Sequence, residues 1–291
     1  MNAKDRIRNE AAKKVIILDG AAGTQLQARG MPGGACPEAW CLENPEAIMA
    51  VHRDYQEAGS EVVYTCTFGA NRFKLSEYGQ ALNVHDINRD LARLARSAVG
   101  DRCLVAGDIG PTGRFIEPFG DVGFEEAVEA FKEQVRGLLD GGVDLFVIET
   151  MVDIQEARAA LIAVREVTDA FTLVTVTFEA SGRTLNGTDP VSALITLQAL
   201  GADAVGCNCS TGPDEMIPLI SAMEPYARVP LVAKPNAGLP ELIDGKTVFP
   251  MSPGEFSTHC ETLLASGIRF LGGCCGTTPA HIRRGAAAAA K

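Results

Sequence analysis

The stretch DGGVDLFVIET at 140–150 joins a helix end, a short turn, a buried strand and an acidic residue. Its two glycines permit the positive backbone φ angle that ends many helices. The apolar run after them is almost continuous, which is typical of parallel strands buried on both faces. Similar phrases recur as EAGSEVV (57–63), LGADAVG (200–206) and ASGIRFLG (265–272). This repeated helix–turn–strand connection predicts a fold of alternating helices and parallel strands.

Apolar runs of this kind are distributed along the whole chain. There are eight: 15–19, 61–65, 103–108, 144–150, 172–178, 203–208, 230–235 and 268–273. Amphipathic stretches between them predict helices at 45–59, 124–142, 153–167, 189–201 and 252–267, with Asp153, Asp189 and Ser252 as N-caps. Eight such units without a change of composition predict a single-domain α/β fold, the (β/α)8 TIM barrel, over residues 1–291. An open doubly wound sheet is the weaker alternative, because no Gly-x-Gly-x-x-Gly follows the first run.

Composition and charge narrow the class of protein further. The 291 residues are 46% hydrophobic and 22% charged, which is typical of a globular chain. A net charge of −11 argues against binding to nucleic acid or to an anionic membrane surface. No apolar run approaches the ~20 residues that span a bilayer, and the polar N-terminus lacks a signal-peptide core. We therefore expect a cytoplasmic protein whose nine cysteines, an odd number, are mostly reduced.

Polar and thiol side chains recur where the predicted strands end. In a barrel of this class the active site lies at the C-terminal ends of the strands. Acidic and amide residues at those positions are Asp19, Asp108, Glu149, Glu179 and Asn236, and thiols follow in GCNCS (206–210) and GGCCG (272–276). The predicted active site is therefore rich in carboxylates and sulfur.

The thiols indicate a metal site. Strand 8 of a closed barrel lies two places from strand 6, so the adjacent Cys274 and Cys275 can meet a thiol from the CNC stretch. Three thiolates hold Zn²⁺ at ~2.3 Å and leave the fourth tetrahedral position open, which is typical of a catalytic zinc. Spacing leaves Cys207 and Cys209 both possible as the third ligand, and Cys209 is the better candidate because it lies nearer the loop.

The remaining cysteines and histidines suggest no competing centre of equal strength. Buried or surface thiols without a metal role are expected at Cys36, Cys41, Cys66, Cys103 and Cys260. A redox or acyl nucleophile at Cys274 or Cys275 would need a nearby base. The four histidines, at positions 52, 85, 259 and 281, all fall in helix-like stretches away from the strand ends. A barrel that binds metal without turnover is a further alternative.

Seven motifs together resemble one known family. They are LDGAAGTQLQARG, YTCTFGANRFKL, GDIGPTG, IETM, GCNCSTGP, KPNAGLP and GGCCGTTP, in this order over residues 15–279. They are similar to the homocysteine S-methyltransferase family, which includes the homocysteine-binding module of cobalamin-dependent methionine synthase and, more distantly, betaine–homocysteine methyltransferase. The resemblance implies a zinc-dependent barrel that activates homocysteine as a zinc thiolate and methylates it to methionine.

The resemblance also implies roles for individual residues. Cys209, Cys274 and Cys275 correspond to the zinc ligands, and Cys207 is then a bystander. The implied substrate-binding residues are Asp19 and Glu149 for the amino group, Thr65 and the backbone near Gly20 as further contacts, and Asp108 and Asn236 as supports.

The methyl donor is indicated by the same comparison of motifs. Several of them resemble the methionine-synthase module more than the betaine enzyme, which favours methylcobalamin, a methylcorrinoid, as donor. No Asp-x-His-x-x-Gly motif of a corrinoid domain is found. The corrinoid is therefore expected on a separate protein, or on another domain of a longer protein of which this chain is a fragment. The alternative is a stand-alone enzyme that uses S-methylmethionine or betaine, although the strand 2 loop lacks an aromatic cage for a quaternary ammonium group.

Overall fold

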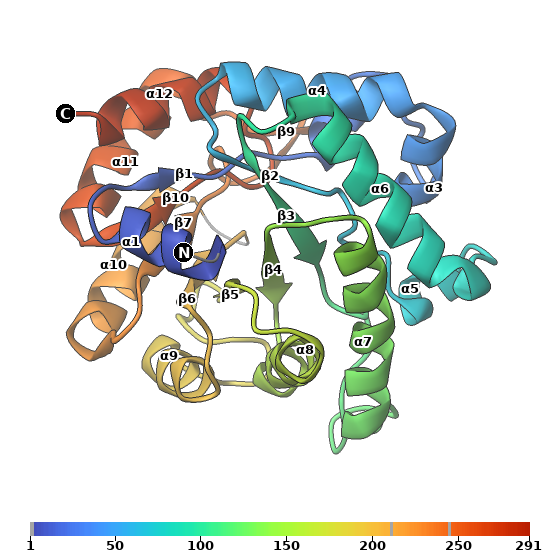
Figure 1. Ribbon diagram of the computed structural model, residues 1–291. Coiled ribbons are helices and arrows are strands. Elements are labelled where there is room, and N and C mark those ends of the chain that lie inside the picture. The colour runs from blue at the N-terminus through green and yellow to red at the C-terminus, as the bar shows by residue number, and fades with distance from the viewer. Residues whose placement is uncertain (1–2, 210–211, 244–245) are drawn as a thin grey trace.

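The structure, a computed structural model, describes residues 3–209, 212–243 and 246–291, in which eight parallel strands form a barrel surrounded by helices (Figure 1). The strands are β1 (Ile16–Ile17), β2 (Val62–Tyr64), β3 (Leu104–Ile109), β4 (Leu145–Met151), β5 (Thr172–Val176), β6 (Ala204–Asn208), β7 (Leu231–Lys234) and β10 (Ile268–Leu271). Their order is β1–β10–β7–β6–β5–β4–β3–β2, and a parallel bridge between Leu18 and Val62 joins the two ends. The predicted (β/α)8 class is confirmed, and each of the eight apolar runs matches one barrel strand, with β3 and β4 extending one residue beyond their runs.

A helix follows each barrel strand and packs on the outside. These helices are α4 (Pro45–Glu57), α6 (Val84–Val99), α7 (Phe124–Asp140), α8 (Ile154–Val167), α9 (Pro190–Ala199), α10 (Pro213–Met223), α11 (Pro253–Ala265) and α12 (Pro279–Ala289). All five predicted helices are present. The predicted caps are also found, since Asp153 and Asp189 accept backbone N–H groups and Ser252 forms a capping box with Glu255.

Strand residues alternate between two apolar layers, as the period of a β-strand requires. In β4, Leu145 and Val147 face the barrel interior, where they join Phe171 and Phe270. Their neighbours Phe146 and Ile148 belong to the layer between the barrel and its helices. Both layers are buried and apolar, which explains why the strand sequences are continuous apolar runs.

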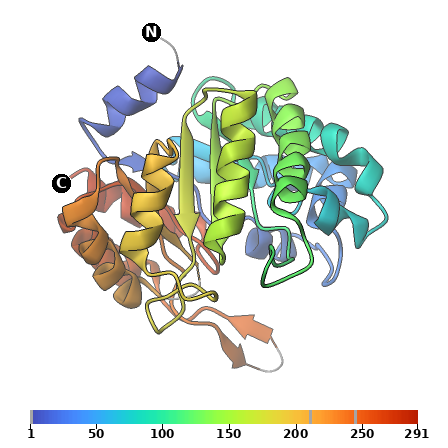
Figure 2. The ribbon, with the colours of Figure 1, turned by 90° about the horizontal axis from the view of Figure 1, so that it is seen from below.

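The two ends of the barrel are covered by different segments (Figure 2). Helix α1 (Ala3–Ala11) lies at the N-terminal end of the strands, and its Ile7 and Ala11 are fully buried in the interior cluster. The hairpin β8 (Glu241–Ile243) and β9 (Lys246–Val248), which belongs to the segment between β7 and α11, lies at the opposite end. The insertion after β1 contains the short helices α2 (Gly23–Gln27) and α3 (Pro37–Glu43). Short elements elsewhere are α5 (Arg72–Ser76) and the 3₁₀ helices η1 (Ala81–Asn83) and η2 (Glu224–Tyr226).

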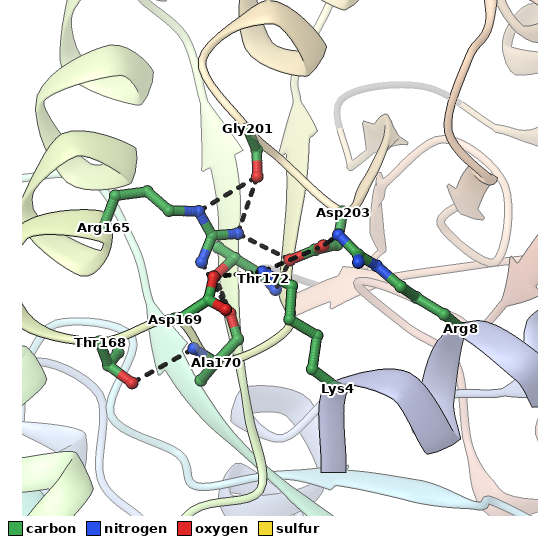
Figure 3. A network of polar contacts seen from close by, with 9 residues as sticks. All are labelled: Lys4, Arg8, Arg165, Thr168, Asp169, Ala170, Thr172, Gly201 and Asp203. Carbon is green, nitrogen blue, oxygen red and sulfur yellow. Dashed lines mark hydrogen bonds and ion pairs between the residues drawn. The ribbon is translucent and has the colours of Figure 1, made fainter. Parts of the chain in front are cut away.

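A buried carboxylate attaches α1 to the barrel (Figure 3). The side chain of Asp203 is fully buried and accepts hydrogen bonds from Arg8 at 2.5 Å, Arg165 at 2.7 Å and the backbone N–H of Thr172 at 2.9 Å. Lys4 adds an ion pair at 3.5 Å. The polar N-terminal segment shows no strong pattern in the sequence. Its helix α1 is attached to one end of the barrel by the ion pairs of Lys4 and Arg8 with Asp203. No helix in the described ranges has the length and apolar character needed to cross a membrane.

Candidate active site

Three cysteine side chains converge at the C-terminal end of the barrel from two strand ends. Cys209 directly follows β6, and Cys274 and Cys275 follow β10. Their sulfur atoms all lie within 4.8 Å of one another, and the Sγ atoms of Cys209 and Cys275 are 3.8 Å apart. Within residues 3–209, 212–243 and 246–291, no other group of three or more His, Cys, Asp or Glu side chains is arranged to share a metal ion.

The turn that carries the cysteine pair depends on glycine. Gly276 has a φ of +77°, and a Cβ atom there would lie 2.1 Å from the ring of Phe249. The N–H of Cys274 donates to the carbonyl of Pro235 at 2.8 Å, which ties the turn to the end of β7. Glycine at position 276 thus permits the turn in which two consecutive cysteine side chains face one point.

The structure separates the two thiols that spacing alone does not distinguish. Cys207 lies within β6, is 1% exposed and packs in the apolar layer beneath the helices. The strand ends at Asn208, and Cys209 takes a φ of +61° while its N–H donates to the carbonyl of Lys234 at 3.2 Å. This change of backbone direction after the strand brings the sulfur of Cys209, and not that of Cys207, to the cysteine pair.

Asn208 contacts the cysteine cluster through Cys274, a role that was not predicted from the sequence. Its side chain is buried and exchanges two hydrogen bonds with Thr150, one from the backbone N–H at 2.9 Å and one to the hydroxyl at 2.8 Å. Its Nδ2 also lies 3.7 Å from the sulfur of Cys274. Thr150 has a φ of +62°, an uncommon value for a β-branched residue. The Asn in the CNC stretch is the only sequence signal of this support.

The donor set fits a zinc ion. Hydrogen bonding from Cys209 and burial raise the pKa of Cys274 to about 11, and the neighbouring thiols raise that of Cys275 well above its usual range. Without a cation both groups hold their protons at neutral pH. A divalent metal ion would replace these protons, because only the thiolate form is a metal ligand. Three converging sulfur atoms match a tetrahedral zinc site with one open position.

A second cluster of charge lies beside the thiols and contains the two predicted acids. Asp19 follows β1 and Glu149 belongs to β4, and both face the ammonium group of Lys234 at the end of β7. Lys234 Nζ lies 3.1 Å from Glu149 and 3.6 Å from Asp19. The same Nζ stands 3.5 Å from the ring centroid of Tyr64, and Tyr64 donates its backbone N–H to Asp19 at 2.7 Å. The sequence around this lysine carries no signal of such a role.

Burial decides the protonation of the cluster. It raises the pKa of Asp19 to about 6 against the opposing effect of Lys234, so this carboxyl is ionised at neutral pH. Burial also raises the pKa of Glu149, again opposed by Lys234. For Lys234, burial acts to lower the pKa, but Glu149, Tyr64 and Asp19 together raise it well above its usual range. The lysine is therefore a permanent buried cation.

The other predicted polar residues surround the same region. Thr65 is fully buried, and its hydroxyl accepts the N–H of Asp108 at 3.0 Å and contacts the hydroxyl of Thr67 at 2.6 Å. Asp108 and Asn236 are buried as well, and each has a side-chain oxygen without a hydrogen-bond partner among the residues that the structure describes. Because unpaired buried oxygens are costly, these atoms are suited to receive a ligand.

Gly20 lies where strand 1 leaves the barrel. A Cβ atom there would be 2.7 Å from the hydroxyl oxygen of Thr277 and 2.8 Å from the ring of Tyr55. Tyr55 in turn donates to the carbonyl of Ala21 at 2.8 Å. The glycine therefore allows the backbone after Asp19 to lie close to the turn that bears the cysteine pair.

The remaining thiols and histidines lie apart from this centre. The other free cysteines are all buried, at positions 36, 41, 66, 103, 207 and 260. The sulfur atoms of Cys41 and Cys66 are 3.9 Å apart, a proximity that the sequence does not reveal. His52, His85, His259 and His281 lie on the outer helices α4, α6, α11 and α12, as predicted.

Comparison with known proteins identifies the class. Residues 16–289 match the family described as homocysteine S-methyltransferase. The chain belongs to this family, and so to the methyltransferase enzymes, as the seven motifs indicate.

Individual relatives agree with this assignment. The methionine synthase of Mycobacterium tuberculosis (strain ATCC 25618 / H37Rv) is 35% identical over an alignment of 299 positions that covers 96% of this chain and 25% of the relative. That of Mycobacterium leprae (strain TN) is 35% identical over 300 residues with the same coverage. This chain thus spans about a quarter of the length of these relatives.

Among solved structures, the fold matches the metallated form of the homocysteine methyltransferase MmuM from Escherichia coli. The TM-score is 0.82 at 24% sequence identity, and the match covers 98% of this chain and 99% of that one. The likeness supports the barrel fold.

Proposed function

We propose that this barrel is a zinc-dependent S-methyltransferase that converts homocysteine to methionine. The observation that carries the proposal is the convergence of Cys209, Cys274 and Cys275, whose sulfur atoms lie within 4.8 Å of one another. Membership of the homocysteine S-methyltransferase family supplies the class of reaction.

The three cysteines would hold the metal ion as thiolates and leave its fourth position to the substrate. A bound zinc ion would supply the Lewis acidity that keeps a substrate thiol, whose free pKa is ~8.5, in its nucleophilic thiolate form. Asn208 would keep Cys274 in place through its bonds to Thr150.

The charged cluster beside the thiols would orient the substrate. Asp19 and Glu149 would bind the α-ammonium group, and Thr65, the backbone near Gly20, Asp108 and Asn236 would complete the pocket. Glu149 is close enough to Cys274 for the thiolate to raise the pKa of the carboxyl. A substrate held at both its sulfur and its ammonium group has few remaining orientations, which favours in-line attack on a methyl group.

We assign the methyl donor to a methylcorrinoid carried by a separate protein or domain. The loops around the thiols expose apolar side chains, which are Phe68, Phe115, Phe119, Leu185, Leu239, Leu242 and Val248. They follow β2, β3, β5 and β7, so they surround the mouth of the barrel. Such a rim suits docking of a large partner better than capture of a small cationic donor. The curated relatives, about four times as long as this chain, contain further segments.

The proposal is tested by methionine formation measured with mass spectrometry. Zinc-loaded protein receives homocysteine with methylcobalamin, S-methylmethionine or betaine in separate reactions. Product with methylcobalamin alone supports the full proposal, and product with a small donor contradicts the assignment of the donor. Tightly bound zinc without any product would indicate a non-catalytic metal-binding barrel.

A pair of variants tests the metal ligands. Cys209→Ala should remove both the bound zinc and the activity, whereas Cys207→Ala, two residues earlier and within β6, should retain them. Equal zinc content in the two variants would contradict the ligand set.

A further inference from the structure

Lys234 has a setting that the reaction scheme does not require. Its side chain is 3% exposed at the end of β7, and its ammonium group lies among Glu149, Asp19 and the ring of Tyr64. A buried lysine is costly unless its charge is compensated. Here it is compensated by the same two carboxylates that are proposed to bind the substrate ammonium group.

The side chain of Lys234 therefore already occupies the site that is proposed to bind the substrate ammonium group. The tether keeps the lysine ammonium at a high effective concentration next to both carboxylates. An ammonium group that arrives with the substrate has to displace Nζ from Glu149, and each new ion pair is then offset by one that is lost. The amino group of the substrate therefore adds little net binding free energy.

We infer that Lys234 is a specificity-determining residue, which occupies the ammonium subsite and lets the protein accept thiol acids that lack an α-amino group. The inference rests on the proposed function, in which the thiol cluster binds the sulfur of the substrate. It extends the substrate class from one amino acid to ω-sulfanyl carboxylic acids of similar length.

Calorimetric titration of the zinc-loaded protein tests the inference without any methyl transfer. The two probes are homocysteine and 4-sulfanylbutanoate, which differ only in the amino group. In the wild-type protein their dissociation constants should differ by less than about tenfold. In Lys234→Met, which keeps an unbranched side chain of nearly the same length but removes its charge, the preference for homocysteine should rise by about 10- to 100-fold, the value of one hydrogen bond to a charged group.

A matched control is Lys132→Met. Lys132 is a partly buried lysine that pairs with Glu129 and Glu166 on the outer helices. Its loss should leave both dissociation constants unchanged.

Each outcome is decisive. An unchanged or smaller preference in Lys234→Met would overturn the inference, because the lysine would then support the fold or bind the substrate carboxylate. If this variant does not fold, the wild-type ratio decides, and a preference above about tenfold for homocysteine overturns the inference. Failure of both thiols to bind the wild-type protein would contradict the proposed function itself, and the inference with it.

Discussion

Replacement of Asn208 by alanine should lower both the stability of the fold and the affinity for zinc. The side chain is 1% exposed and makes two hydrogen bonds to Thr150 and one weak contact to Cys274. A typical hydrogen bond contributes about 1 kcal/mol, so loss of the set should lower the free energy of unfolding by roughly 2–4 kcal/mol. Because partners behind a metal ligand orient it, zinc affinity should also fall by about 10- to 100-fold.

The assay compares two variants with the same chemical change. Asn88 is equally buried, and its Nδ2 donates to the carbonyls of Ala70 and Val84 at 2.8 and 2.7 Å, far along the chain from the thiols. Asn88→Ala should therefore lose similar stability, measured by urea unfolding of the metal-free protein, with unchanged zinc affinity, measured by competition with a chelator. An equal loss of zinc affinity in both variants, or none in Asn208→Ala, would refute the reasoning.

Three further predictions concern the frame around the site. Gly20→Ala should destabilise the fold by about 1–3 kcal/mol, because its Cβ meets Thr277 at 2.7 Å; an unchanged urea midpoint would count against this contact. Burial lowers the pKa of His52 from 6.5 to about 4, so its protonation favours the unfolded chain. The contribution of neutral His52 to the free energy of unfolding is fully present above pH 6.5 and decreases as the pH falls towards 4. About 2 kcal/mol of this free energy should be lost between pH 7.5 and 5. His52→Leu should abolish this part of the slope in urea titrations, and a parallel profile would exclude His52 as its source. Asp203→Ala leaves Arg165 and Arg8 without their buried partner and should cost roughly 3–5 kcal/mol, with faster proteolysis of the N-terminal helix; a loss under about 1 kcal/mol would contradict the role of this carboxylate.

The barrel is readable from the sequence because its signals are local. Each strand is a short apolar run, and Gly59, Gly142, Gly201 and Gly267 all adopt the positive φ that ends a helix before the next strand. The position of helix α1 cannot be predicted in this way, because only Ile7 and Ala11 of the helix are buried. Its attachment to the barrel depends on Asp203, a residue far along the chain. Contacts of this kind leave no periodic trace in the sequence.

The candidate site is predictable only in part for the same reason. The adjacent Cys274 and Cys275 are conspicuous among glycines, and closure of the barrel brings them to the end of β6. The choice of Cys209 over Cys207 depends on a backbone turn with φ of +61°, which spacing does not encode. Lys234 ends an apolar strand and resembles an ordinary boundary residue, so its place between two carboxylates becomes visible only in three dimensions.

The position of the thiols along the chain has a consequence for biosynthesis. A nascent chain carries none of the three sulfur atoms until residue 209, and the set is complete only at residue 275 of 291. The last two arrive with β10, the strand that inserts between β7 and β1 and closes the ring. A metal ion that binds all three sulfur atoms would therefore bind only the closed barrel and would stabilise it by mass action. Binding of a metal ion to all three thiols would then require that β10 has already paired with β7 and β1.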